Sequence, residues 1–106
     1  MEFLKWVNTS SHHGFSYYLD AVIPAGETKY IKMPVVTPNK RGVNDIGFAY
    51  DNGITLFATL SEKPLSDGAI WQEIQPFDEI NKTVACIKIQ NSGTKSARVN
   101  IRAILN

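Results

Sequence analysis

Residues 46–60 read IGFAYDNGITLFATL, and the middle of this stretch holds the strongest local signal in the chain. Asn52-Gly53 separates two runs of residues. Within each run, the residues at even positions differ in character from those at odd positions. Asparagine followed by glycine tolerates the positive φ angles of a type I′ turn, whose twist matches that of two paired strands. The stretch therefore predicts a two-residue β-hairpin with strands over 46–51 and 54–60.

The predicted pairing gives this hairpin two different faces. One face is aliphatic with small residues opposite, which is typical of a core: Ile54, Leu56, Ala58 and Leu60 against Gly47 and Ala49. The other face would pair Tyr50 with Thr55, Phe48 with Phe57, and Ile46 with Thr59. A sandwich strand needs only one buried face. Either another segment of the chain covers the aromatic face, or it is a subunit or ligand interface made by Phe48, Tyr50, Phe57, Thr55 and Thr59.

The same period-two alternation recurs along the rest of the chain and predicts further strands over 15–23, 31–35, 69–74, 83–90 and 98–105, with a short first strand over 3–7. Pro24-Ala25-Gly26-Glu27 has turn chemistry and predicts a second hairpin between 15–23 and 31–35. Seven to eight short strands without a helical period indicate one all-β domain over residues 1–106. The expected fold is an antiparallel β-sandwich, either jelly-roll or immunoglobulin-like.

Composition excludes several classes of function. Eleven basic and ten acidic residues give a formal net charge of +1, which provides no field for nucleic acid or an anionic membrane. Cys86 is the only cysteine, so no intrachain disulfide can form and the fold must depend on its core. No signal peptide and no apolar run of about 18 residues is present. We expect a protein made in a reducing cytosol.

The chain offers little for catalysis, which needs a nucleophile, a base and an orienting group together. His12 and His13 are adjacent, and in a strand they would point to opposite faces. Cys86 is flanked by apolar residues with no histidine near it in sequence, which favours packing over reactivity. Asp78-Glu79 is a short acidic pair in a connecting segment. We expect no enzyme activity, no metal site and no cofactor.

Two other surfaces can be expected from the sequence. Lys88, Arg98 and Arg102 are predicted to share the solvated outer face of the last two strands. Trp71 shares a face with Glu73, opposite Ile70 and Ile74, so its ring could be exposed. Exposed aromatic rings can stack on sugar rings. Trp71 and Tyr18 are therefore the candidate platforms of an alternative function, that of a carbohydrate-binding module.

Several phrases of the sequence resemble small β-sandwich proteins of tailed phages. They are Val22–Gly26 (VIPAG), Ile54–Pro64 (ITLFATLSEKP), Trp71–Ile74 (WQEI), Ile87–Asn91 (IKIQN) and Ala97–Asn106 (ARVNIRAILN). The resemblance implies a structural protein of a phage or prophage particle, such as a capsid-decorating or tail-associated subunit, which assembles as a homo-oligomer or docks on the particle. The resemblance assigns no functional residue in this sequence. The expected function is therefore non-catalytic assembly with protein partners.

Overall fold

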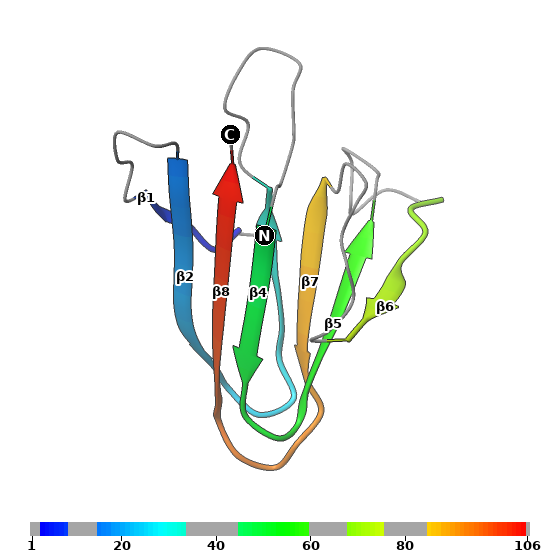
Figure 1. The fold of residues 1–106 in the computed structure, drawn as a ribbon. Coiled ribbons are helices and arrows are strands. Elements are labelled where there is room, and N and C mark those ends of the chain that lie inside the picture. The colour runs from blue at the N-terminus through cyan, green and yellow to red at the C-terminus, as the bar shows by residue number, and fades with distance from the viewer. Residues whose placement is uncertain (1–2, 9–14, 34–44, 60–67, 76–84, 106) are drawn as a thin grey trace.

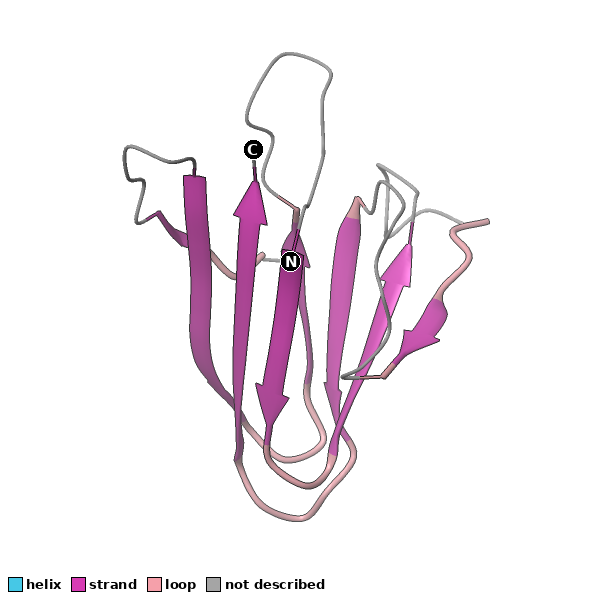
Figure 2. Ribbon diagram, in the orientation of Figure 1, coloured by secondary structure: helices cyan, strands magenta, loops and turns pink. Residues whose placement is uncertain are grey.

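The computed structural model describes residues 3–8, 15–33, 45–59, 68–75 and 85–105, and every regular element within them is a β-strand (Figures 1 and 2). The strands are β1 (Val7–Asn8), β2 (Phe15–Ile23), β3 (Thr28–Lys32), β4 (Asp45–Tyr50), β5 (Ile54–Thr59), β6 (Gln72–Ile74), β7 (Cys86–Asn91) and β8 (Ala97–Leu105). Their positions follow the predicted ones within a few residues. The strand expected over 31–35 begins earlier, at Thr28, and residues 34 and 35 lie outside the described ranges.

The strands form two four-stranded sheets, in the orders β1-β2-β8-β4 and β3-β7-β5-β6, and all strand pairs are antiparallel. The all-β sandwich expected from the sequence is confirmed. The pairs are nested: β2 lies beside β8, β3 beside β7, and β5 beside β6. Such nesting arises when one long hairpin is wrapped around a barrel axis. It is the arrangement of a jelly roll, one of the two sandwiches expected.

The predicted hairpins are wrong, because their strands belong to different sheets. β4 pairs with β8, whereas β5 pairs with β6 and β7. The Asn52-Gly53 turn therefore crosses from one sheet to the other, as the turn between β2 and β3 also does (Figure 1). Consequently none of the pairs expected between 46–50 and 55–59 forms. Alternation of apolar and polar residues defines the two faces of a strand but does not identify the strand that pairs with it. When the chain crosses between the sheets at a turn, each strand can direct its apolar face toward the opposite sheet.

The core fills the space between the two sheets. Its buried members are Leu19, Ile23, Ile31, Met33, Ile54, Leu56, Ala58, Ile74, Ile87, Ile89, Ala97, Val99, Ile101 and Ala103. The central strands β7 and β8 contribute Ile87, Ile89 and Val99, whose side chains have no exposed surface. Burying this much branched aliphatic surface is the main favourable term in folding a chain of this length.

Asn91 holds together the end of the sandwich at which β2–β3, β4–β5 and β7–β8 cross between sheets (Figure 1). Its Nδ2 donates to the carbonyls of Ile23 and Lys95, both at 2.9 Å, and its Oδ1 accepts from the Gly93 N–H at 2.9 Å. The Asn91 side chain is 1% exposed, so these bonds replace all contact with water. One amide thereby connects the end of β2 with the turn into β8.

Backbone bonds extend this arrangement, called here the turn junction, to the other two turns. Gly26 N–H donates to the Asn91 carbonyl, and Asn91 N–H donates to the Glu27 carbonyl. Ser92 N–H donates to the Gly53 carbonyl at 3.0 Å. A Cβ at Gly53 would lie 3.0 Å from Asn91 Oδ1, and Gly53 has a φ of +100°, so only glycine suits this position.

The N-terminal segment links the two sheets at one side of the sandwich. Phe3 forms a parallel bridge with Tyr30 of β3, and Leu4 N–H donates to the Tyr30 carbonyl at 2.8 Å. Four residues later, Val7 of β1 pairs with Tyr18 of β2. The Trp6 indole N–H donates to the Lys32 carbonyl at 2.7 Å. The segment thus covers part of the β3 edge, a protection that exposed sheet edges generally need.

Candidate binding face

The outer side of the β3-β7-β5-β6 sheet carries a row of side chains that pairing aligns across four strands. Tyr30 lies opposite Lys88, Lys88 opposite Phe57, and Phe57 opposite Glu73. Residues directly opposite each other in a sheet point to the same side. The residues on either side of this row, such as Ile31 and Ile87, point into the core.

Trp71, which immediately precedes β6, contacts two residues of this row, Lys88 and Tyr30. The Lys88 ammonium lies 4.4 Å from the centre of the Phe57 ring and 4.9 Å from that of Trp71. The Tyr30 and Trp71 rings have centroids 5.7 Å apart and are tilted by 51°. A cation within about 6 Å of an aromatic centroid is attracted to the negative face of the ring. Lys88 therefore holds two aromatic side chains from different segments.

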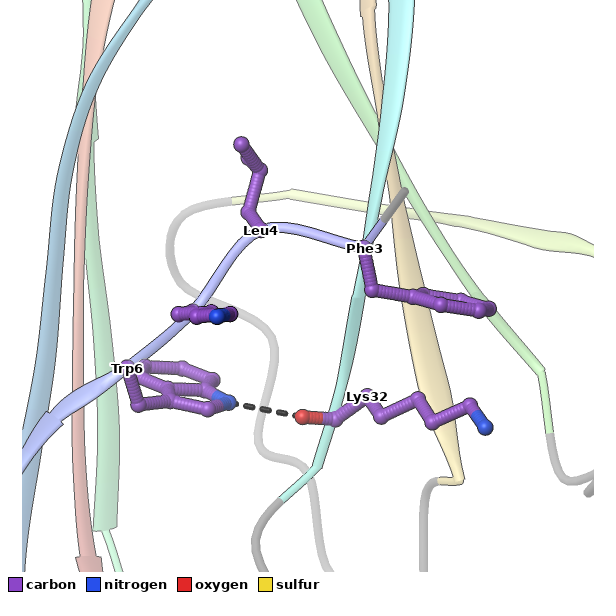
Figure 3. A pocket seen from close by; sticks show the side chains of 5 residues that line it. Phe3, Leu4, Trp6 and Lys32 are labelled. Carbon is purple, nitrogen blue, oxygen red and sulfur yellow. Dashed lines mark hydrogen bonds between the residues drawn. The ribbon is translucent and has the colours of Figure 1, made fainter. Parts of the chain in front are cut away.

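The contacts continue toward the N-terminal segment. Phe3 meets Tyr30 edge to face, with centroids 6.4 Å apart, and the Lys32 ammonium lies 4.7 Å from the Phe3 ring. Figure 3 shows the Phe3 ring and the Lys32 side chain extending side by side, with the Trp6 indole bonded to the Lys32 carbonyl. Phe3, Trp6 and Lys32 line an open hollow of about 530 Å³, together with Leu4 and Lys5.

The six residues Phe3, Tyr30, Lys32, Phe57, Trp71 and Lys88 form one continuous chain of ring and ammonium contacts, called here the aromatic–lysine face. Its rings and Lys88 are half-buried, and Lys32 is exposed. In the described part of the chain, neither lysine is ion-paired with a carboxylate. Ile70, beside Trp71, is 82% exposed, the most exposed large apolar side chain of the described residues.

This arrangement combines flat apolar surface with positive charge. Rings present flat apolar surface at little conformational cost, and the two ammonium groups add positive charge beside them. Cys86, at the start of β7, is fully buried, and desolvation raises the pKa of its thiol to about 11. A thiol with that pKa is protonated at neutral pH, so Cys86 is no nucleophile there. This agrees with the packing role expected for Cys86.

The five residues predicted as one interface do not share a surface, which corrects that prediction. Phe48 and Tyr50 lie on β4 and pack against the core from within. Phe57 and Thr55 lie on the outer side of β5, and Thr59 is 4% exposed. The error follows from the pairing, because β4 and β5 present these residues to opposite sides once they belong to different sheets.

Other predicted groupings are also separated by the sheet arrangement. Trp71 belongs to the aromatic–lysine face, whereas Tyr18, 40% exposed, lies on the other sheet opposite Arg102. The two candidate stacking residues therefore do not form one platform. Lys88 likewise does not share a face with Arg98 and Arg102, because β7 and β8 belong to different sheets. His12, His13, Asp78 and Glu79 lie outside the described residues.

Comparison with family models, with curated proteins and with solved structures yields no match to this chain. Within residues 3–8, 15–33, 45–59, 68–75 and 85–105 there is no group of three or more side chains suited to holding a metal ion. The same residues include no helical segment with the length and hydrophobicity of a membrane span.

Proposed function

We propose that this chain is a non-catalytic assembly protein that docks through its aromatic–lysine face, on further copies of itself or on a larger particle such as a phage or prophage virion. The observation that carries the proposal is the unbroken chain of contacts from Lys32 through Trp71 to Phe57 on an outer sheet face. Jelly rolls occur in viral capsid proteins and in lectins, so the fold alone assigns neither function.

The aromatic residues of this face are of the kind that protein interfaces favour. Tryptophan and tyrosine dominate binding hot spots, and aromatic residues are enriched where interfaces are most deeply buried. A single exposed aliphatic residue such as Ile70 is ordinary on a protein surface, whereas contiguous patches such as the linked rings of this face mark interaction sites. A phage or prophage particle is the partner that the resemblance noted in the sequence would imply.

The test is the solution mass, measured by light scattering after size-exclusion chromatography over a range of protein concentrations. Self-association predicts a mass that is a multiple of the 11.8 kDa chain. Lys32→Asp should shift the population toward monomer, because Lys32 is the exposed member of the face. Arg102→Asp is the matched control, because Arg102 is exposed on the outer side of the other sheet, opposite Tyr18. A wild-type monomer at every concentration would overturn self-association and leave docking on a larger particle to be tested.

Glycan binding is the second candidate function, and the Trp71–Tyr30 pair favours it. The two tilted rings, 5.7 Å apart, could form a bent platform for a sugar, with Tyr30 replacing the predicted Tyr18. The experiment is a fluorescence titration of the Trp6→Phe variant with a broad panel of glycans, since Trp71 is then the only tryptophan. A saturable change in emission supports the module, and no change across the panel contradicts it.

A further inference from the structure

We propose that Asn52 is a site of spontaneous covalent modification, in which the backbone nitrogen of Gly53 displaces the Asn52 amide, and that one product of this reaction loosens the turn junction. The proposal is independent of the assembly function. It rests on the geometry of the turn that carries the chain from β4 to β5.

The turn leaves both reacting groups free. Ile54 N–H donates to the Asp51 carbonyl at 3.4 Å, the bond between the first and fourth residues of a β-turn. Such a bond does not use the N–H of the third residue, which here is Gly53. Asn52 is exposed, and within the described residues no hydrogen bond holds its side-chain amide or the Gly53 N–H. The glycine also has no side chain to shield its nitrogen.

The reaction needs only water and a base to remove the Gly53 amide proton. The Gly53 nitrogen attacks Cγ of Asn52, so an N–Cγ bond forms while the Cγ–Nδ2 bond breaks and ammonia leaves with the proton. The product is a five-membered cyclic imide. Water then opens one of its two C–N bonds and produces a new carboxylate. Opening at the side-chain carbonyl gives aspartate at position 52, whereas opening at the backbone carbonyl gives isoaspartate.

The two products differ in what they do to the turn junction. Isoaspartate routes the main chain through the side-chain carbon and so lengthens the backbone by one methylene before Gly53. The Gly53 carbonyl accepts from Ser92 N–H at 3.0 Å and from Ser92 Oγ at 3.4 Å, and the residue lies against Asn91. A displaced Gly53 cannot keep these contacts. Aspartate leaves the backbone unchanged and adds only a charge at an exposed position.

Two other asparagines serve as internal controls. The Asn91 amide is held by three hydrogen bonds, and the N–H of the next residue, Ser92, donates to Gly53. Asn100 lies within β8 and is followed by the buried, branched Ile101. At Asn91 both the amide and the next N–H are hydrogen-bonded, and at Asn100 the branched side chain of Ile101 hinders attack by its nitrogen. Among these three asparagines, the reaction should therefore be confined to Asn52.

The experiment is to age the full chain at physiological temperature, at mildly acidic and mildly alkaline pH. Peptide mapping and labelling by an isoaspartate-specific methyltransferase locate and quantify the products. We expect conversion at Asn52 to exceed that at Asn91 and Asn100 by more than an order of magnitude and to be faster at alkaline pH. The Asn52→Ser variant should gain no label at this position. Equal rates at the three asparagines would overturn the proposal.

Thermal unfolding tests the second part of the proposal, that isoaspartate at position 52 loosens the turn junction. The isoaspartate-containing fraction, separated by ion exchange, should melt below freshly prepared Asn52→Asp protein, which carries the same charge without the extra methylene. The fresh variant should melt close to unaged wild type. If the isoaspartate fraction and Asn52→Asp have the same melting temperature, the turn junction does not depend on the backbone length at Asn52. The second part of the proposal would then be wrong.

Discussion

Strand β7 passes through two regions that hold distant segments together by different physics. At its end, Asn91 forms the turn junction, where a buried amide joins the end of β2 to the turn into β8 and neighbouring backbone bonds add the turn between β4 and β5. In its middle, Lys88 forms the aromatic–lysine face, where half-buried rings and an ammonium meet without directional bonds. Buried, satisfied polar groups are costly to disturb, whereas ring and cation contacts at a surface are weak and exchangeable. The first region therefore suits stability, and the second is the surface that we propose for binding.

The largest expected effect is at the junction. Asn91→Ala leaves the buried Ile23 carbonyl, and the part-buried Lys95 carbonyl and Gly93 N–H, without their partner. Unsatisfied buried groups cost about 1–3 kcal/mol each, so we expect a loss of about 3–5 kcal/mol in the free energy of unfolding. Urea denaturation followed by circular dichroism measures this loss.

Asn100→Ala is the matched control, because Asn100 is a half-buried asparagine of β8. It should change the free energy of unfolding by less than about 1 kcal/mol, as is typical of substitutions away from a buried network. Similar losses for the two variants would show that the turn junction is no stronger than an ordinary strand position. The contrast between the two regions of β7 would then disappear.

A smaller effect is expected at the opposite end of β7, as a function of pH. Burial raises the pKa of Cys86 from 9.0 to about 11, so the folded protein retains the proton after the unfolded chain has lost it. The thiol's contribution to stability is complete below pH 9.0 and is lost as the pH rises from 9.0 to about 11. The change is of order 2 kcal/mol.

The measurement for Cys86 is the difference between wild type and Cys86→Ala in the free energy of unfolding, because tyrosines and lysines titrate in the same range in both proteins. The difference should be constant below pH 9.0 and should shrink above it. A difference that does not vary with pH would show that the thiol titrates alike in both states, and hence that its surroundings are wetter than its burial indicates.

The sequence was sufficient for the fold class, because alternation and turn residues mark strands wherever one face is buried. It was insufficient for pairing. Asn52-Gly53 favours a tight reversal, but the same reversal can return a strand beside its neighbour or across to the opposite sheet. The choice depends on where β7 and β8 lie, and those strands come more than 25 residues later in the chain. Local chemistry cannot contain that information.

The candidate site shows the same limit more severely. Trp71 could be singled out because its face opposes Ile70 and Ile74. The other residues of the aromatic–lysine face could not be predicted to join it. Phe3, Tyr30 and Lys88 come from three further segments, which only the sheet register brings together. Phe48 was misplaced for the same reason: an aromatic residue in an alternating strand has an equal chance of facing inward until its sheet is known. Sites built across strands are therefore less predictable than the strands.

Within the aromatic–lysine face, Trp71→Ala should have the larger effect on stability. It removes the ring that contacts both Tyr30 and Lys88. Aromatic pairs and cation–π contacts each contribute about 0.5–1.5 kcal/mol, so we expect a loss of about 1–2 kcal/mol in the free energy of unfolding. Tyr18→Ala, on the opposite outer face, should cost clearly less. Equal losses in the free energy of unfolding for the two variants would indicate that the contacts of Trp71 with Tyr30 and Lys88 do not stabilise the fold.

The smallest effect separates the charge of Lys88 from its aliphatic stem. Lys88→Met keeps a flexible apolar side chain between Phe57 and Trp71 but removes the ammonium from both rings. The expected loss in the free energy of unfolding is about 0.5–1 kcal/mol, the size of cation–π contacts at partly exposed sites. Lys95→Met, in an exposed turn, should cost nothing measurable. If Lys88→Met is neutral in stability yet weakens self-association, the ammonium acts on a partner rather than on its own rings, which would assign the aromatic–lysine face to binding more directly than its geometry does.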